Sequence, residues 1–181
     1  MIISKSKNYL FIHIPKTGGS SLRRELIKNK SDGDLVFLDD NQHNKVPSIK
    51  KIYTENDINW KSTFKFAFVR NPWDRVVSYY LYQFKNKLSF KQFVKQSKDT
   101  QLSYIQDKNG DVDVDFVGQF ENYKQDAEFI LKKFGMCQEM KTHTNRTYHK
   151  HYIEYYTNET RCIVEDNYAK DIEYFGYKYG E

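Results

Sequence analysis

The chain has 181 residues, of which 39% are hydrophobic and 29% are charged, and its formal net charge is +5. A chain of this length is expected to form one domain over residues 1–181. No segment approaches the roughly 20 consecutive apolar residues of a membrane span, and Lys5 and Lys7 interrupt any apolar leader. We therefore expect a cytoplasmic protein whose modest positive charge suits an anionic ligand without requiring nucleic acid.

The first distinctive segment is an apolar run at residues 9–14, which predicts a buried strand and ends at Pro15. A helical pattern follows, with Leu22, Leu26 and Ile27 on one face. Between the two lie a cation, two glycines and three hydroxyl side chains: Lys16, Thr17, Gly18, Gly19, Ser20 and Ser21. A strand, a glycine turn and a helix N-terminus together favour phosphate binding, because glycines let the main chain approach an anion that the helix dipole attracts.

This loop differs from the common phosphate loop, GxxxxGK[ST], in which the lysine follows the last glycine. Here Lys16 precedes both glycines. Further along the chain, residues 34–38 predict a short strand and residues 46–53 a helix.

The second distinctive segment predicts a strand over residues 64–69 and a helix over residues 72–84. Asn71 is a suitable N-cap and Pro72 suits the first helical position. Arg70 lies at the strand tip, and Ser78 lies two turns into the helix. The planar guanidinium of Arg70 offers paired hydrogen bonds to a second phosphate. The alternative is that Arg70 pairs with an acidic neighbour.

The remaining sequence predicts a short helix after Ser89, a turn at Lys108-Asn109-Gly110 and a strand over residues 117–120. A last long helix is expected from Thr157 or Asn158 to Gly176. Strands that alternate with helices favour an α/β fold. We expect a single-domain, P-loop-like three-layer sandwich with a central parallel sheet flanked by helices. Both motifs then leave strand C-termini, where such sheets bind ligands.

Taken in order, residues 11–26 and 64–84 resemble the nucleotide-binding core of the sulfotransferase family. HIPKTGGSSL is similar to the family's 5′-phosphosulfate loop, and FAFVRNPWDRVVSYY to its 3′-phosphate segment. The resemblance is strongest to the branch of carbohydrate sulfotransferases that includes heparan sulfate 2-O-sulfotransferase. Weaker likenesses continue in residues 115–126 and 168–180.

The resemblance implies that the chain uses 3′-phosphoadenosine 5′-phosphosulfate (PAPS) and releases 3′-phosphoadenosine 5′-phosphate (PAP). The sulfuryl acceptor would be a hydroxyl, most simply of a saccharide or glycoconjugate. Lys16 would stabilise the leaving phosphate, and the loop from Thr17 to Ser21 would hold the 5′ end. Arg70 and Ser78 would bind the 3′-phosphate.

An acceptor hydroxyl needs a base, and an imidazole is suited to that role near neutral pH. His43 is the leading candidate, because the segment that begins with it, HNKVPSIKKI, resembles a family region that carries a histidine between the cofactor motifs. Asp39, Asp40 and Glu121 are the fallback bases. A surface histidine is the alternative interpretation of His43.

We assign no metal, because the histidines at 143, 149 and 151 lack a supporting cysteine or acidic set. The two cysteines, Cys137 and Cys162, are too few for a disulfide framework. Arg146 and Lys150 lie in a basic segment, for which we keep two expectations: contact with the cofactor or with an anionic acceptor, or a solvated loop.

Two other classes of function remain open on the residues. The first is a P-loop-type nucleotide phosphotransferase or kinase, which the displaced lysine and the lack of a Mg²⁺-binding carboxylate motif disfavour. The second is a non-catalytic polyanion-binding protein, which the 24 acidic residues spread along the chain disfavour.

Overall fold

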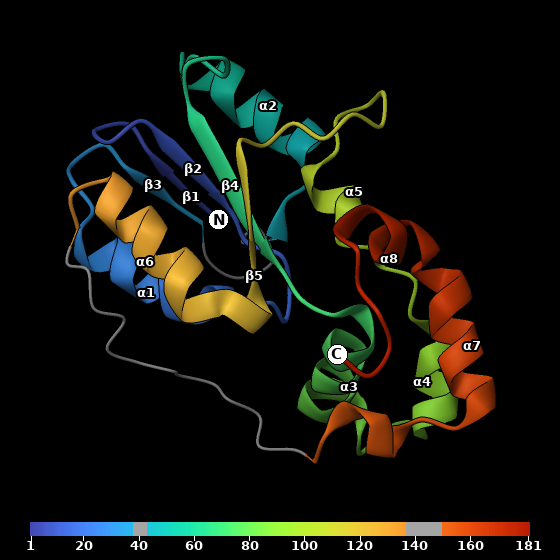
Figure 1. Ribbon diagram of the computed structural model, residues 1–181. Coiled ribbons are helices and arrows are strands. Elements are labelled where there is room, and N and C mark those ends of the chain that lie inside the picture. Colours follow the sequence, from blue (N-terminus) through green and yellow to red (C-terminus); the bar gives the residue numbers. More distant parts are fainter. Residues whose placement is uncertain (38–42, 137–149) are drawn as a thin grey trace. The chain divides into compact units, whose positions relative to one another are not determined.

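A computed structural model describes residues 1–37, 43–136 and 150–181 of the chain (Figure 1). The chain forms two compact units. The first, here called the sheet unit, comprises Met1–Val69 and Ser103–Asn145, and the second, here called the helical unit, comprises Arg70–Leu102 and Arg146–Glu181. The first motif therefore belongs to the sheet unit, while Arg70 and Ser78 belong to the helical unit.

The sheet unit is built on a five-stranded sheet with the strand order β3-β1-β2-β4-β5. Its strands are β1 (Ile2–Ser4), β2 (Tyr9–Ile12), β3 (Leu35–Val36), β4 (Phe64–Val69) and β5 (Phe116–Gln119). The pairs β2–β4 and β4–β5 are parallel, whereas β1 is antiparallel to both β2 and β3. The expected α/β fold is confirmed, but the sheet is mixed rather than parallel throughout. The three residues of β1 are too few to show a sequence period, so this strand was not predicted.

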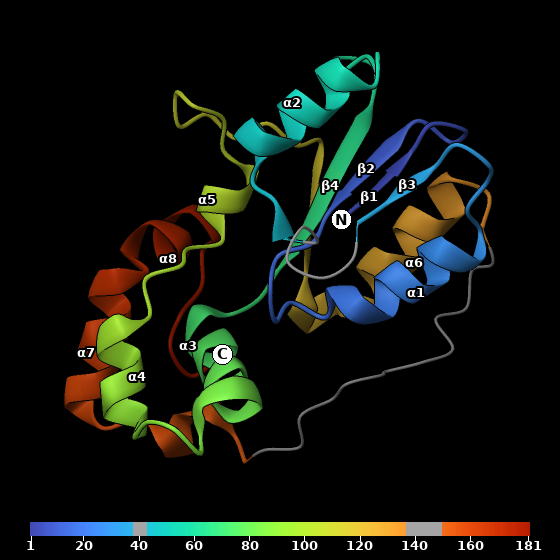
Figure 2. The same ribbon diagram turned by 180° about the vertical axis from the view of Figure 1, so that it is seen from behind.

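Helices cover both faces of this sheet, as Figures 1 and 2 show from opposite sides. Helices α1 (Gly19–Lys28) and α6 (Tyr123–Lys133) lie together on one face, and α2 (Val46–Glu55) lies on the other. On the face that α1 and α6 cover, alternate residues of the strands place aromatic side chains in the core, because successive side chains of a strand point to opposite faces. This core includes Tyr9, Phe11, Phe66 and Phe68 from the strands and Leu22, Leu26, Ala127 and Ile130 from the helices.

The helical unit has its own apolar core, in which Trp73, Val77, Phe93 and Val164 are buried. Its elements are α3 (Pro72–Tyr79), the π-helix η2 (Tyr80–Phe84), α4 (Phe90–Gln96), the 3-10 helix η4 (Tyr152–Tyr155), α7 (Asn158–Asn167) and α8 (Ala169–Phe175). The short helix α5 (Leu102–Ile105) begins at the last residue of this unit's first segment, and the 3-10 helix η3 (Phe120–Asn122) precedes α6 in the sheet unit.

Two predicted helices are each divided in the structure. The helix expected over residues 72–84 is α-helical only to Tyr79 and continues as a π-helix, a form that sequence periodicity does not distinguish. The last helix breaks at Tyr168, which separates α7 from α8, and ends at Gly176 with φ 71°. The predicted cap at Ser89 is confirmed, because its hydroxyl accepts a hydrogen bond from the Gln92 N–H.

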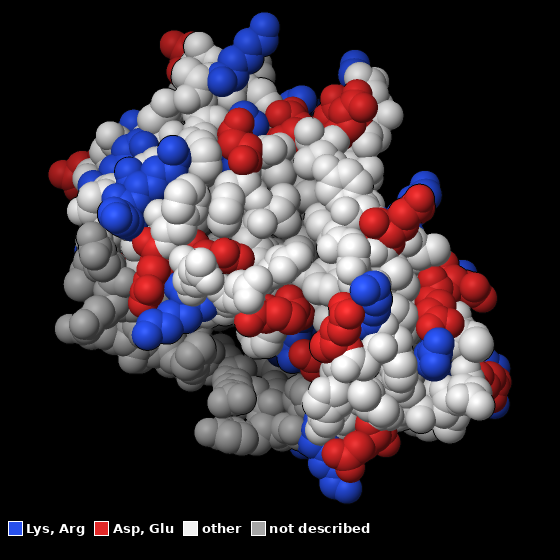
Figure 3. Space-filling model, viewed as in Figure 1, with Lys and Arg blue, Asp and Glu red and all other residues white. Residues whose placement is uncertain are grey.

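Within residues 1–37, 43–136 and 150–181, no helix combines the length and the apolar character needed to cross a bilayer. Figure 3 shows acidic and basic side chains side by side over much of the face in view, with Lys and Arg gathered over one end of α6. That end carries Lys132 and Lys133 in its last turn, where positive charges interact favourably with the negative end of the helix dipole.

Candidate active site

The loop between β2 and α1 has two residues in the left-handed region of φ. Lys16 has φ 66° and Gly18 has φ 80°. Such a φ is unusual for a lysine and marks a constrained turn of the kind found at functional sites. Helix α1 begins at Gly19, directly after Gly18, and no side chain caps it. The Ser21 N–H donates to the Gly18 carbonyl at 3.1 Å. The main-chain N–H groups and the positive dipole end of a helix N-terminus attract anions, so this terminus is suited to bind one.

Two hydroxyl side chains of the sheet unit donate hydrogen bonds to main-chain carbonyls of this loop. The Thr17 hydroxyl donates to the carbonyl of Ile14 at 3.0 Å, and Thr17 is only 1% exposed. From α6, the Tyr123 hydroxyl donates to the carbonyl of Gly18 at 2.9 Å. Burial raises the pKa of the Tyr123 phenol well above its ordinary value, so the hydroxyl keeps the proton it donates. No role was predicted for Tyr123, because its hydrogen-bond partner lies 105 residues away in the sequence.

Both glycines of the loop are closely packed. A Cβ at Gly18 would lie 3.0 Å from side-chain carbons of both Phe120 and Tyr123. A Cβ at Gly19 would collide with the imidazole of His13. The glycines thus serve two needs at once, a left-handed turn at Gly18 and close contact with neighbouring rings at both positions.

His43 lies beside the residues that lead into the loop. Its Nδ1 is 2.6 Å from the carbonyl oxygen of His13, and the two imidazole centroids are 4.5 Å apart. Because a carbonyl can only accept, Nδ1 carries the proton, and the Nε2 of a neutral ring then holds the lone pair. A side chain with this tautomer can accept a proton from a hydroxyl. The structure therefore brings His43 and the first motif together, with His13 between them.

We expect Gly18→Ala to destabilise the protein more than Gly33→Ala. Both positions have positive φ, 80° and 86°. An alanine at either position is therefore held in the left-handed region, which costs about 1–2 kcal/mol of stability. Only the Cβ at Gly18 meets other side chains, since a Cβ at Gly33 has nothing within 4 Å. Overpacking should add about 1–3 kcal/mol at Gly18. Urea unfolding of the two variants measures the difference, and equal losses of stability would contradict this packing.

Arg70 follows β4 directly and opens the helical unit. Its Nε and Nη2 donate to Oδ2 of Asp74 at 2.8 and 2.7 Å, and the residue is 8% exposed. The acidic neighbour considered as the alternative partner is therefore present. Asn71 caps α3 as predicted, accepting from the N–H groups of Trp73 and Asp74. Ser78 lies in α3 and is 3% exposed.

The other distinctive residues of this segment have structural partners within the helical unit. Arg75 donates to the carbonyl of Asp99 at 2.6 Å and pairs with its carboxylate at 3.3 Å. Trp73 is 2% exposed and packs edge-on against Tyr179 at 5.4 Å. This aromatic contact and the surrounding helical core hold Trp73 within its own unit.

Several candidates from the sequence lie outside the described residues. These are the fallback bases Asp39 and Asp40, together with Cys137, His143, Arg146 and His149. Glu121 lies in η3 and is exposed.

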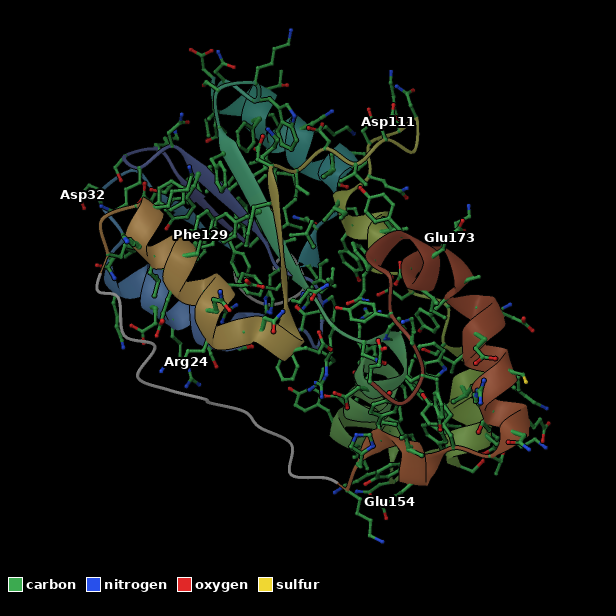
Figure 4. The ribbon with its side chains drawn as sticks, viewed as in Figure 1. Arg24, Asp32, Asp111, Phe129, Glu154 and Glu173 are labelled. Atoms are coloured by element: carbon green, nitrogen blue, oxygen red, sulfur yellow. The ribbon has the colours of Figure 1, made fainter. Side chains whose placement is uncertain are left out.

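In the parts of the chain that the structure describes, no three His, Cys, Asp or Glu side chains gather as metal ligands would. In the sheet unit, Figure 4 shows Arg24 on α1 and Phe129 on α6 projecting from the helices.

Residues 1–178 match the sequence profile of the family described as the Sulfotransferase family. Because this match spans almost the whole chain, the protein belongs to the sulfotransferase family. The mixed sheet flanked by helices is the fold of that family. A crystal structure of mouse sulfotransferase SULT7A1 complexed with PAP superposes with a TM-score of 0.58 at 13% identity, covering 94% of this chain and 86% of the mouse chain.

Two relatives are similar in sequence. Carbohydrate sulfotransferase 14 of Danio rerio is 22% identical over 223 residues, covering 95% of this chain. The aligned region is 58% of the Danio rerio protein, so this chain spans little more than half of that relative's length. An uncharacterized protein of Archaeoglobus fulgidus is 42% identical over 90 residues, which are 44% of this chain and 74% of that protein.

Proposed function

We propose that this chain is a sulfotransferase that moves a sulfuryl group from PAPS to a hydroxyl, with Lys16 and His43 as its catalytic residues. The observation that carries the proposal is the uncapped N-terminus of α1 behind a left-handed turn that contains Lys16. A main-chain anion site next to a lysine suits the 5′-phosphosulfate of PAPS. The residues that would hold it are Lys16, Thr17, Gly18, Gly19, Ser20 and Ser21.

The reaction is an in-line displacement at sulfur. The acceptor oxygen forms the new S–O bond while the bond from sulfur to the bridging oxygen breaks, and that oxygen leaves on the phosphate of PAP. Negative charge grows on the leaving oxygen as the bond breaks. Lys16 and the first N–H groups of α1 would stabilise this charge more in the transition state than in the ground state.

His43 would remove the proton of the acceptor hydroxyl. Its Nδ1–H donates to the carbonyl of His13, which leaves Nε2 as the proton acceptor. His13 lies three residues before Lys16, so a base held by its carbonyl is close in sequence and in space to the phosphate loop. Glu121 is the alternative base. It lies in the 3-10 helix η3, which ends directly before Tyr123, whose hydroxyl donates to the carbonyl of Gly18.

The 3′ end of PAPS would be bound by Arg70 and Ser78. Strands β2 and β4 are parallel neighbours, with Ile12 opposite Ala67, so the chain leaves both at the same edge of the sheet. The phosphate loop follows β2, and Arg70 follows the last residue of β4. Ligands of sheets with parallel strands commonly bind beyond the strand C-termini, which supports a nucleotide site at this edge of the sheet.

We infer that the acceptor is a saccharide or glycoconjugate. The support is the similarity to carbohydrate sulfotransferase 14 over nearly the whole of this chain. A carbohydrate hydroxyl requires a base such as His43, because an alcohol is only a weak nucleophile until its proton is removed.

Arg70→Ala should lower the affinity for PAP about 10- to 100-fold and leave that for 5′-AMP unchanged, because a charge-assisted hydrogen bond contributes about 1.5–3 kcal/mol. Calorimetric titration with both nucleotides measures the ratio. Asp74→Ala is the matched control, since it breaks the same 2.7 Å ion pair but keeps the guanidinium. If Arg70 only formed a structural ion pair, the two variants would behave alike, and that result would remove Arg70 from the binding site.

A further inference from the structure

The main chain of Arg70 is held by the side chain of a residue far along the sequence. The Arg70 N–H donates to Oε1 of Gln101 at 2.8 Å, and Nε2 of Gln101 donates to the Arg70 carbonyl at 2.8 Å. Gln101 is 0% exposed. One primary amide thus pairs with both main-chain polar groups of Arg70, as two residues do in a hydrogen-bonded pair of antiparallel strands. This pairing fixes the direction in which the Arg70 side chain leaves the backbone.

Gln101 is in turn fixed by a carboxylate of α8. Oδ2 of Asp171 accepts from the Gln101 N–H at 2.6 Å, and Oδ1 accepts from the Leu102 N–H at 3.0 Å. Asp171 is 0% exposed. Burial raises the pKa of its carboxyl group, and the two N–H donors oppose that rise. A buried carboxyl group is costly unless hydrogen bonds compensate its desolvation, and here both of its oxygens accept main-chain N–H groups.

The residue after Arg70 is fixed as well. Besides capping α3, the Asn71 side chain donates from Nδ2 to the carbonyl of Lys178 at 3.2 Å. Arg70 therefore has its own main chain paired with Gln101, its guanidinium paired with Asp74, and its neighbour tied to the C-terminal segment of the helical unit.

We propose that Gln101, anchored by Asp171, is a positioning residue that presents Arg70 to the 3′-phosphate of the nucleotide. The inference rests on the proposed role of Arg70. Gln101 acts through Arg70 and need not touch the ligand. A rigid guanidinium binds phosphate better because less conformational freedom is lost on binding.

Gln101→Met keeps the length of the side chain and removes both hydrogen bonds. We expect it to lower the PAP to 5′-AMP affinity ratio about tenfold, with the 5′-AMP affinity unchanged. Gln101→Glu keeps an acceptor for the Arg70 N–H and loses the donor, so an intermediate ratio is expected. Gln96→Met, at an exposed position of α4, is the matched control and should leave the ratio unaltered. Should Gln101→Met fail to fold, Gln101→Glu supplies the test.

The double variant Arg70→Ala/Gln101→Met distinguishes an effect of Gln101 through Arg70 from a general loss of structural order in the helical unit. If Gln101 acts through Arg70, its replacement leaves the ratio unchanged once Arg70 is absent. The inference is overturned if Gln101→Met leaves the ratio intact in the natural sequence, or lowers it equally in both backgrounds. An unchanged ratio for Arg70→Ala alone would instead overturn the proposed role of Arg70 itself.

Discussion

Lys16→Ala is expected to lower kcat about 100- to 1,000-fold, the loss typical when one group that stabilises a developing oxyanion is removed. The affinity for PAP should fall much less, because in the proposed site the N–H groups of the α1 N-terminus would still bind the phosphate. Alanine is the informative substitution, because alanine and lysine are equally strained at the left-handed φ of 66°. The variant therefore differs in the side-chain cation and not in backbone strain. Single-turnover rates with PAPS and calorimetric PAP binding together separate the two effects.

Lys30→Ala is the control for the loss of one positive charge near α1. Lys30 is exposed and lies two residues after the helix ends, so its removal should leave kcat within twofold of the natural protein. A Lys16→Ala protein with full transferase activity would show that the lysine does not stabilise the leaving group.

His43→Ala should lower kcat about 100- to 10,000-fold, the usual contribution of a general base. Its binding of PAP should stay unchanged, because the base acts on the acceptor. The variant should also lose the rise of rate with pH that an imidazole base imposes near neutrality. Turnover measured from pH 5 to 9 with saturating PAPS tests both expectations.

His151→Ala is the matched control, since His151 is an exposed histidine of the helical unit. Glu121→Gln tests the alternative base. Turnover that survives His43→Ala and is lost in Glu121→Gln would transfer the role of base to Glu121. Loss of PAP binding as well as turnover in His43→Ala would show that the contact with the His13 carbonyl is structural instead.

The parts of the fold with a clear local pattern were predictable from the sequence. The alternation of Phe64, Phe66 and Phe68 predicted β4 with the bounds that the structure has. The glycines and the apolar positions after them predicted the turn and α1. Strand β1 was not predictable, because its three residues are stabilised by pairing with strands on both sides rather than by a pattern of their own.

The candidate site was predictable where the chemistry lies in consecutive residues. Lys16 and the glycines are adjacent, so their sequence already defined a loop. The supporting contacts are long-range: Tyr123 reaches Gly18 across 105 residues, and Asp171 reaches Gln101 across 70. No sequence period encodes such pairs, because tertiary packing alone brings them together. The ion pair of Arg70 with Asp74 was open to prediction as the acidic-neighbour alternative, because the two residues are only four apart in sequence.

Calorimetric titration with PAP, using 5′-AMP and ATP as comparison ligands and no added metal, tests the proposed nucleotide site directly. We predict clear preference for PAP, since it alone among the three nucleotides carries the 3′-phosphate that we assign to Arg70. Equal binding of all three nucleotides, or no binding, would contradict it. Binding of ATP that is strong and requires Mg²⁺ would favour a phosphotransferase instead.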